Sequence, residues 1–226
     1  MPAVMHLPTH RLIDQVLCAS ILSILGAACS QAGAPMPAGS VLFQDDFSRS
    51  SSGWEIQHRA DAIHEYRDGL YAMLALSPHT SSWSTPGLEV GAARIEVDAL
   101  QIGGPEDNLF GVVCRYRDDG NFVFLVASSD GFAGIGSYHE GRRELFGGAA
   151  LLPAASIAPA GSTNHLAADC LEDTLRLNVN GALAAEAVSV GGDAQGDIGL
   201  IVSTYLEPGV ELVFDNFSVR VPEPEP

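Results

Sequence analysis

Two carboxylates at alternate positions, Glu96 and Asp98, are the residues of this sequence whose type and spacing most directly suggest chemistry. Between Ala92 and Leu100 they alternate with apolar residues, so a strand would place both acids on one face and the apolar side chains on the other. Carboxylates on an exposed face can accept hydrogen bonds from sugar hydroxyls. The pair is therefore a candidate for sugar binding.

Two arginines and two aromatic residues extend this candidate surface. Arg115 and Arg117 alternate with other residues in the strand pattern, which predicts that both guanidinium groups project from one face, shared with the two acids if the strands are neighbours. An aromatic side chain nearby could stack on a pyranose ring. The predicted ligand-binding residues are Glu96, Asp98, Arg115, Arg117, Trp83 and Tyr138. The alternative is a surface of mutually neutralising ion pairs, with the aromatic residues in the core.

The composition excludes several functions. The chain has 226 residues, with 28 acidic residues against 11 lysines and arginines and a formal net charge of −17. All 11 are arginine, so a lysine nucleophile or Schiff base is excluded. Nucleic-acid binding needs clustered positive charge, so nucleic acid is not an expected partner. The length fits an export signal followed by one domain of about 180 residues, which is enough to bury a full core.

The N-terminal part is predicted to direct export. Residues 1–28 form a signal peptide whose apolar run is too short to span a bilayer comfortably. Leu25–Cys29 resembles a bacterial lipobox and predicts lipidation of Cys29, while the alternative is ordinary signal-peptidase cleavage after Ala28 or Ala34. Residues 29–40 are rich in Ala, Gly and Pro, which is typical of a flexible linker. The expected product is an exported cell-envelope lipoprotein that meets the membrane only through its lipid anchor.

The cysteines agree with export. Cys18 would leave with the signal peptide and Cys29 would carry the lipid, which leaves Cys114 and Cys170. In an oxidising compartment this pair predicts a disulfide, worth about 4 kcal/mol in the chain-entropy model. The alternative is two buried free thiols at strand positions.

Short strands separated by turn-forming residues are predicted from Val41 to Val221. Leu109–Phe146 contains four such runs and predicts an antiparallel meander. Asp68–Gly69 and Asn180–Gly181 predict two-residue hairpin turns, and Trp54–Ile56 predicts a short strand.

The remaining segments complete an all-β prediction. An uncharged stretch, residues 147–162, is long enough for a functional loop and could lie over a groove. Residues 222–226 are predicted to be a disordered tail. Because no convincing helix occurs outside the signal peptide, the expected fold is a sandwich of two antiparallel sheets.

A series of short motifs resembles the concanavalin A-like lectin/glucanase domains of exported bacterial proteins. The motifs, in order, are Asp45–Phe47, Gly53–Trp54, Asp68–Gly69, Glu96–Asp98, Gly111–Tyr116, Asn121–Phe122, Val179–Gly181, Gly196–Leu200 and Phe214–Phe217. They are similar to laminin G-like jelly rolls and to the domain named for 3-keto-disaccharide hydrolases, and they span residues 41–221. The resemblance implies a jelly roll with a concave face often used for glycans, and it does not imply catalysis.

Two further expectations depend on this resemblance. Glu96–Gln101 resembles the Glu-x-Asp-x-x-Glu strand of laminarinase-type glucanases, but Gln101 stands where the acid/base glutamate is expected and cannot protonate a leaving group. No catalytic residue is therefore predicted. No cofactor is required, although Asp46 and Asp215 occupy matching places where a calcium ion is a candidate.

The predicted function is an exported, membrane-anchored, non-catalytic module that binds carbohydrate or another cell-surface polymer. One alternative is a glycoside hydrolase that uses carboxylates other than the Glu96 strand. Another is a structural or adhesion domain that binds protein through an exposed sheet.

Overall fold

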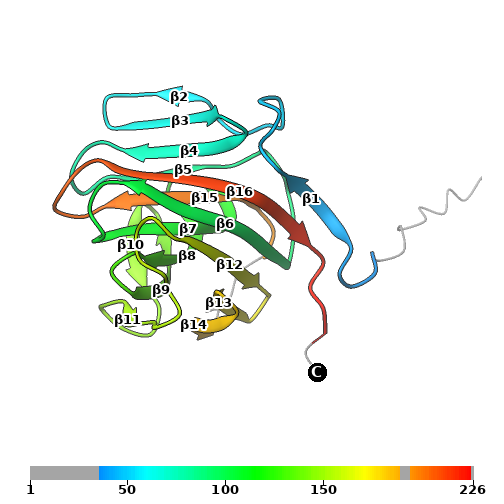
Figure 1. The fold of residues 1–226 in the computed structure, drawn as a ribbon. Helices are drawn as coiled ribbons and strands as arrows, with labels where there is room; N and C mark the ends of the chain where they lie inside the picture. Colours follow the sequence, from blue (N-terminus) through cyan, green and yellow to red (C-terminus); the bar gives the residue numbers. More distant parts are fainter. Residues whose placement is uncertain (1–35, 189–193, 225–226) are drawn as a thin grey trace, which may run out of the picture. The chain divides into compact units, whose positions relative to one another are not determined.

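The computed structural model describes residues 36–188 and 194–224, and in this part the chain folds into strands and turns without a helix (Figure 1). Accordingly, none of these residues belongs to a helix able to cross a bilayer. The predicted signal peptide, the lipidation residue Cys29, the linker up to residue 35 and the last two residues of the predicted tail lie outside the described residues.

Two antiparallel sheets contain all of the described strands. Sheet A has the order β14 (Ala182–Val188), β13 (Thr174–Val179), β12 (Thr163–Cys170), β6 (Ala93–Gly103), β16 (Val210–Arg220), β4 (Leu70–Ala75), β3 (Ala62–Arg67) and β2 (Gln57–His58), with β1 (Val41–Asp45) paired to β16. Sheet B has the order β10 (Arg142–Leu145), β9 (Phe132–His139), β8 (Asn121–Ser128), β7 (Asn108–Asp118), β15 (Asp197–Thr204) and β5 (Ser81–Ser84), with β11 (Leu152–Pro153) paired to β9. The predicted all-β sandwich is confirmed.

The predicted hairpin turns join the strands as expected. Asp68 and Gly69 connect β3 to β4 with φ values of 55° and 79°, and Asn180 and Gly181 connect β13 to β14 with φ values of 52° and 83°. Positive φ at both central residues matches the right-handed twist of the strands they join. The predicted meander is also confirmed, because β7, β8, β9 and β10 pair in sequence order.

The predicted strand at Trp54–Ile56 is wrong. These residues form no strand, and the first pairing in this region occurs in β2. Trp54 instead serves as a core residue, because its indole packs against Phe47 and Phe217 and its Nε1 donates a 3.0 Å hydrogen bond to the buried Asp45 carboxylate. The apolar residue is buried by tertiary packing rather than by sheet pairing.

The core lies between the inner faces of the two sheets. On β6 the predicted alternation is confirmed, because Ile95, Val97 and Ala99 are fully buried while the intervening residues are partly exposed. Cys114 of β7 and Cys170 of β12 form a disulfide, so the alternative of two free thiols is wrong. This bond joins sheet B to sheet A.

Close packing within sheet B leaves no room for a side chain at Gly111. A Cβ atom on Gly111 of β7 would lie 2.1 Å from the Leu125 carbonyl oxygen of β8. Gly111→Ala should therefore lower the free energy of unfolding by about 1–3 kcal/mol or more, because backbone must move. Chemical denaturation measures this change. The control is Gly103→Ala in β6, where the atom nearest to an added Cβ is the Oε2 atom at the end of the flexible Glu211 side chain, at 3.3 Å; an equal loss in the control would contradict the steric argument.

Candidate functional site

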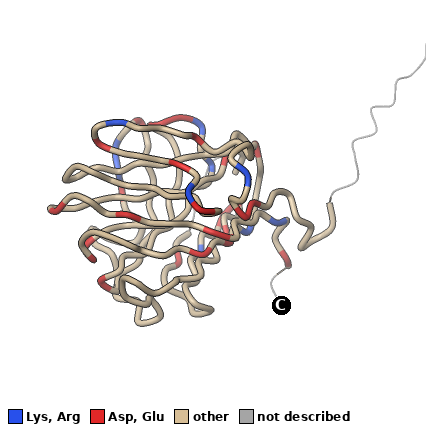
Figure 2. The backbone as a smooth tube through the Cα atoms, turned by 45° about the horizontal axis from the view of Figure 1, so that its top comes forward, with Lys and Arg blue, Asp and Glu red and all other residues tan. Residues whose placement is uncertain are grey.

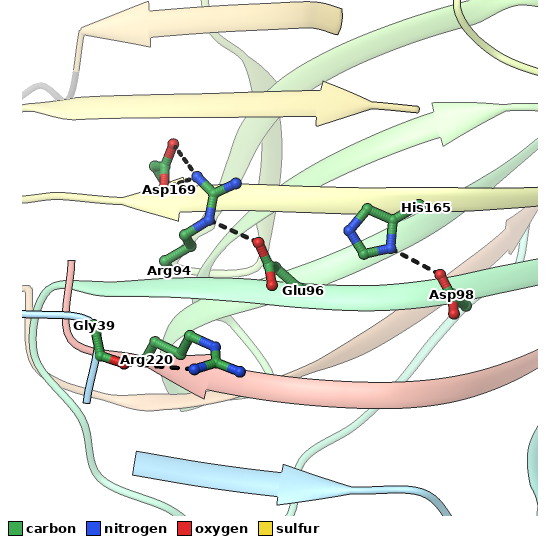
Figure 3. Close-up of polar contacts among 7 residues, drawn as sticks. All are labelled: Gly39, Arg94, Glu96, Asp98, His165, Asp169 and Arg220. Atoms are coloured by element: carbon green, nitrogen blue, oxygen red, sulfur yellow. Dashed lines mark hydrogen bonds and ion pairs between the residues drawn. The ribbon is translucent and has the colours of Figure 1, made fainter. Parts of the chain in front are cut away.

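The predicted acids lie on the outer face of sheet A. Acidic positions are spread along the coloured part of the trace and basic ones are few (Figure 2). On β6, Arg94 donates from Nε to Glu96 at 2.8 Å and from Nη1 to Asp169 of β12 at 2.9 Å (Figure 3). Glu96 is therefore half of an ion pair between residues on the same strand face.

Asp98 also has partners on both neighbouring strands. Its Oδ1 lies 2.8 Å from Nδ1 of His165 on β12 (Figure 3), and its Oδ2 accepts a 2.9 Å hydrogen bond from the Asn216 amide on β16. Both predicted acids are thus engaged by neighbours in the sheet. This arrangement matches the alternative of a self-neutralising surface.

The ion pairs continue across sheet A toward β14. Arg176 of β13 donates to Glu186 of β14 at 2.6 Å. A polar pocket of about 570 Å³ lies at this end of the sheet, and its walls include Arg94, Glu96, Asp169, Arg176 and Arg220. Partly exposed pairs of this kind contribute about 0–1 kcal/mol each. The surface is therefore held in order mainly by the strands beneath it.

Gln101 does not face the same side as Glu96. It is 4% exposed, and its amide nitrogen donates to the carbonyl oxygens of Gly103, Gly104 and Pro105 at 2.9–3.1 Å. Its amide oxygen accepts a 2.8 Å bond from Asn108. Gln101 therefore fixes the connection from β6 to β7. The glutamine is unsuited to acid catalysis both by its chemistry and by its position.

The prediction that Arg115 and Arg117 share a face with Glu96 and Asp98 is wrong. These arginines belong to β7 of sheet B, whereas the acids belong to sheet A. A register shift between Cys114 and Asp118 breaks the alternation, and Arg115 adopts a φ of 54°. Such a bulge re-aims the side chains that follow it.

Arg115 instead supports the fold. Its side chain is buried, and its guanidinium donates to the carbonyl oxygens of Leu171 and Glu172 in the turn after β12. Burial lowers the pKa of Arg115 from its usual value. These bonds lie next to the disulfide and tie β7 to the same turn of sheet A.

The predicted aromatic residues meet on the outer face of sheet B. Trp83 of β5, Tyr116 of β7 and Tyr138 of β9 are partly exposed and surround the buried Phe122 of β8. Their ring centroids lie 4.8, 5.8 and 4.7 Å from that of Phe122, and Trp83 lies 5.8 Å from Tyr138. We call these four residues the aromatic platform. The ring centroids of the platform are separated by distances at which aromatic pairs attract one another, roughly 4.5–7 Å.

Asp119 holds the polar atoms at the edge of the platform. It accepts hydrogen bonds from Trp83 Nε1 at 3.2 Å and from the Tyr116 hydroxyl at 2.8 Å. Burial, together with the bond to this carboxylate, raises the pKa of Tyr116 to about 12. Tyr116 and Asp119 were not predicted as site residues, and the β-bulge that brings Tyr116 onto this face has no local sequence signal.

Comparisons with known proteins identify the fold. No protein-family model matches the chain, and no curated protein matches its sequence. The carbohydrate-binding module CBM66 from Bacillus subtilis superposes with a TM-score of 0.61 at 14% identity, covering 75% of this chain and 96% of the module. A Bacillus subtilis protein of unknown function with a galectin-like fold gives 0.60 at 13% identity, covering 82% and 97%.

A glucanase domain has the same architecture. The catalytic domain of an endo-1,3-beta-glucanase (laminarinase) from Thermotoga petrophila superposes with a TM-score of 0.58 at 11% identity, covering 84% of this chain and all of that domain. The chain has the concanavalin A-like jelly-roll fold. At these identities the likeness concerns the fold alone.

In this concanavalin A-like jelly roll, the first and last strands pair, which places Asp45 opposite Phe217. The Asp46 carboxylate accepts hydrogen bonds from the hydroxyl and the backbone amide of Ser48, and these bonds lower the pKa of Asp46. The Asp215 carboxylate accepts a 2.7 Å hydrogen bond from the backbone amide of Asn216. Among the described residues, no group of three or more His, Cys, Asp or Glu side chains is arranged to hold a metal. Calcium binding by Asp46 and Asp215 therefore stays a prediction.

Proposed function

We propose that this chain is a non-catalytic carbohydrate-binding module that holds a sugar ring against the aromatic platform. The observation that carries this proposal is the partly exposed Trp83, Tyr116 and Tyr138, brought from three strands to one face. Aromatic rings pack well against the C–H faces of sugars, and a cluster of them at a surface is unusual unless it binds something. The carbohydrate-binding and glucanase domains with the same fold support this choice of ligand.

The platform is a better sugar site than the acids of sheet A. A ligand that used Glu96 or Asp98 would compete with Arg94, His165 and Asn216 for their carboxylate oxygens. A ligand on the platform would instead bury apolar surface that is partly exposed, which is favourable by about 25 cal/mol per Å². Contact with the rings therefore adds favourable burial without breaking an existing ion pair.

We further propose that the domain acts outside the cytoplasm, tethered through lipidated Cys29. The disulfide supports this setting, because such bonds persist in oxidising compartments. The Ala-, Gly- and Pro-rich residues 29–40 would give the domain room to reach a polymer at the cell surface. Metabolic labelling of the full chain with a radioactive fatty acid, in wild type and Cys29→Ala, tests the anchor.

Removing the tryptophan of the platform should abolish most sugar binding. Trp83→Ala should weaken binding to an immobilised glycan about thirtyfold or more, because tryptophan is among the residues that form binding hot spots, where truncation costs about 2 kcal/mol or more. The measurement is a glycan array followed by calorimetry with the best ligand. The matched control is Asp98→Asn on sheet A, which should leave affinity unchanged, and circular dichroism should verify that both variants fold.

Other outcomes favour the alternative functions. If Asp98→Asn removes binding and Trp83→Ala does not, the sugar site belongs on sheet A. If wild type binds no glycan, the carbohydrate proposal fails, and a protein-binding adhesion role becomes the better hypothesis. Release of reducing ends from the bound polysaccharide by wild type would instead support the hydrolase alternative.

A further inference from the structure

A pocket with both polar and apolar walls lies on the same face of sheet B as the aromatic platform. Phe132 and Tyr138 occupy the same face of β9 six residues apart, which corresponds to about 20 Å along a strand. At the Phe132 end, a pocket of about 530 Å³ is walled by Asp107, Phe132, Arg143, Leu151 and Tyr205. The platform lies at the Tyr138 end. One face thus presents aromatic side chains at both ends of β9.

The pocket and the platform share supporting side chains. Leu145 and Leu151 line the pocket and also pack against the buried cluster that includes Phe122 and Phe124 beneath the platform. Leu151 reaches over β9, where a Cβ atom on Gly134 would lie 2.4 Å from it. The segment between β10 and β11 therefore forms a wall above the sheet.

Arg143 connects the two regions. It is the cross-strand neighbour of Tyr138, and its guanidinium carbon lies 5.4 Å from the centre of the Phe124 ring. The same side chain lines the pocket. The pocket therefore begins where the platform ends, so a ligand that leaves the platform at Tyr138 meets Arg143 next.

The side chains that line the pocket could contact both the ring and the hydroxyl groups of a sugar. Tyr205 and Phe132 are 49% and 37% exposed and offer ring surfaces. Arg143 can only donate hydrogen bonds and Asp107 can only accept them when ionised, whereas a sugar hydroxyl does both. The net charge of −17 repels a polyanion from the whole molecule. These features together favour a neutral sugar over an acidic one.

We propose that one neutral glycan chain runs from the aromatic platform into the Tyr205 pocket, so that the domain binds two separated sugar units of the same polymer. This inference rests on the proposed function and adds a second contact region and a ligand class to it. Affinity should consequently increase with chain length, because only a long ligand reaches both regions.

The test uses soluble laminarin, xylan and galactan as neutral polysaccharides and alginate as an acidic one, each titrated into the folded chain. For the neutral polysaccharide that binds best, Tyr205→Ala should weaken binding about tenfold, the effect of losing one aromatic contact. Binding of the corresponding disaccharide should not change. Leu206→Ala is the matched control, because Leu206 is adjacent and 70% exposed but does not line the pocket.

The outcomes separate this inference from the proposed function. If Trp83→Ala weakens binding and Tyr205→Ala does not, the second region is rejected while the platform stands. Equal losses for the disaccharide and the polysaccharide would indicate one compact site and would also reject it. Tighter binding of alginate than of every neutral polysaccharide would overturn the ligand class. If none of the four binds, the two-region inference is rejected, and the glycan array alone decides the proposed function.

Discussion

Loss of the Cys114–Cys170 disulfide should lower the free energy of unfolding by about 4 kcal/mol, the largest effect that we expect from any single bond in this domain. The two cysteines are 56 residues apart in the sequence, and closing a loop of that length removes many conformations from the unfolded chain. A typical domain is stable by about 5–15 kcal/mol. The disulfide would therefore supply a large share of the stability.

The measurement is urea denaturation of wild type and of the Cys114→Ala, Cys170→Ala double variant. The second arm repeats both titrations with a reducing agent, which should destabilise wild type toward the variant and leave the variant unchanged. This arm separates the covalent constraint from the packing of the sulfur atoms, because both cysteines are buried. A loss of less than about 1 kcal/mol in the double variant would contradict the chain-entropy account.

Features of the fold that depend on neighbouring residues could be predicted from the sequence. Asp68–Gly69 and Asn180–Gly181 specify hairpins because few other residue pairs adopt positive φ at both positions. The alternation around Val97 specified which side of β6 is buried. The pairing of Cys114 with Cys170 could be predicted from the number of cysteines, because these two remain once Cys18 is assigned to the signal peptide and Cys29 to the lipid anchor.

Features of the fold that depend on residues far apart in the sequence could not be predicted in this way. β6 and β7 are consecutive, yet the connection held by Gln101 carries the chain from one sheet to the other. Nothing local distinguishes this crossing from a hairpin. The bulge at Arg115 likewise reverses the expected direction of its side chain, because register is set by the partner strands. The candidate surface was consequently assigned to residues from two different sheets.

The structure brings the predicted aromatic residues together, whereas it places the predicted charged residues on two different sheets. The sequence predicts Trp83 and Tyr138 as residues that could stack on a sugar, and in the structure their ring centroids lie 5.8 Å apart. Large aromatic side chains reach across several strands, so their meeting tolerates errors in register. Charged residues need the correct face and the correct neighbour, and Glu96 found its partner within its own strand.

Acidification should destabilise the domain through one buried histidine, His64 of β3. Its side chain is fully buried, with the Ser82 hydroxyl 2.8 Å from Nε2 and the Gln57 amide nitrogen 2.8 Å from Nδ1. Burial, with a smaller contribution from the positive charge of Arg59, lowers the pKa of His64 from 6.5 to about 4. The neutral imidazole is therefore the form that the fold accommodates.

The sign of the effect follows from proton binding. Between pH 6.5 and about 4 the unfolded chain takes up a proton on this histidine and the folded chain does not, so stability is lost as the pH falls through this window. The expected loss is about 3 kcal/mol between pH 7 and pH 4. Below pH 4 both states are protonated, and His64 contributes no further loss.

His64→Gln isolates this contribution, because glutamine keeps hydrogen-bonding groups but does not titrate in this range. Urea denaturation of both proteins at intervals from pH 7 to pH 4 gives curves of the free energy of unfolding against pH. Wild type should lose about 3 kcal/mol more than the variant over this range. Carboxylates titrate equally in both proteins, so the difference between the curves reports the histidine alone. Parallel curves across this range would show that His64 takes up its proton as readily in the folded chain as in the unfolded one.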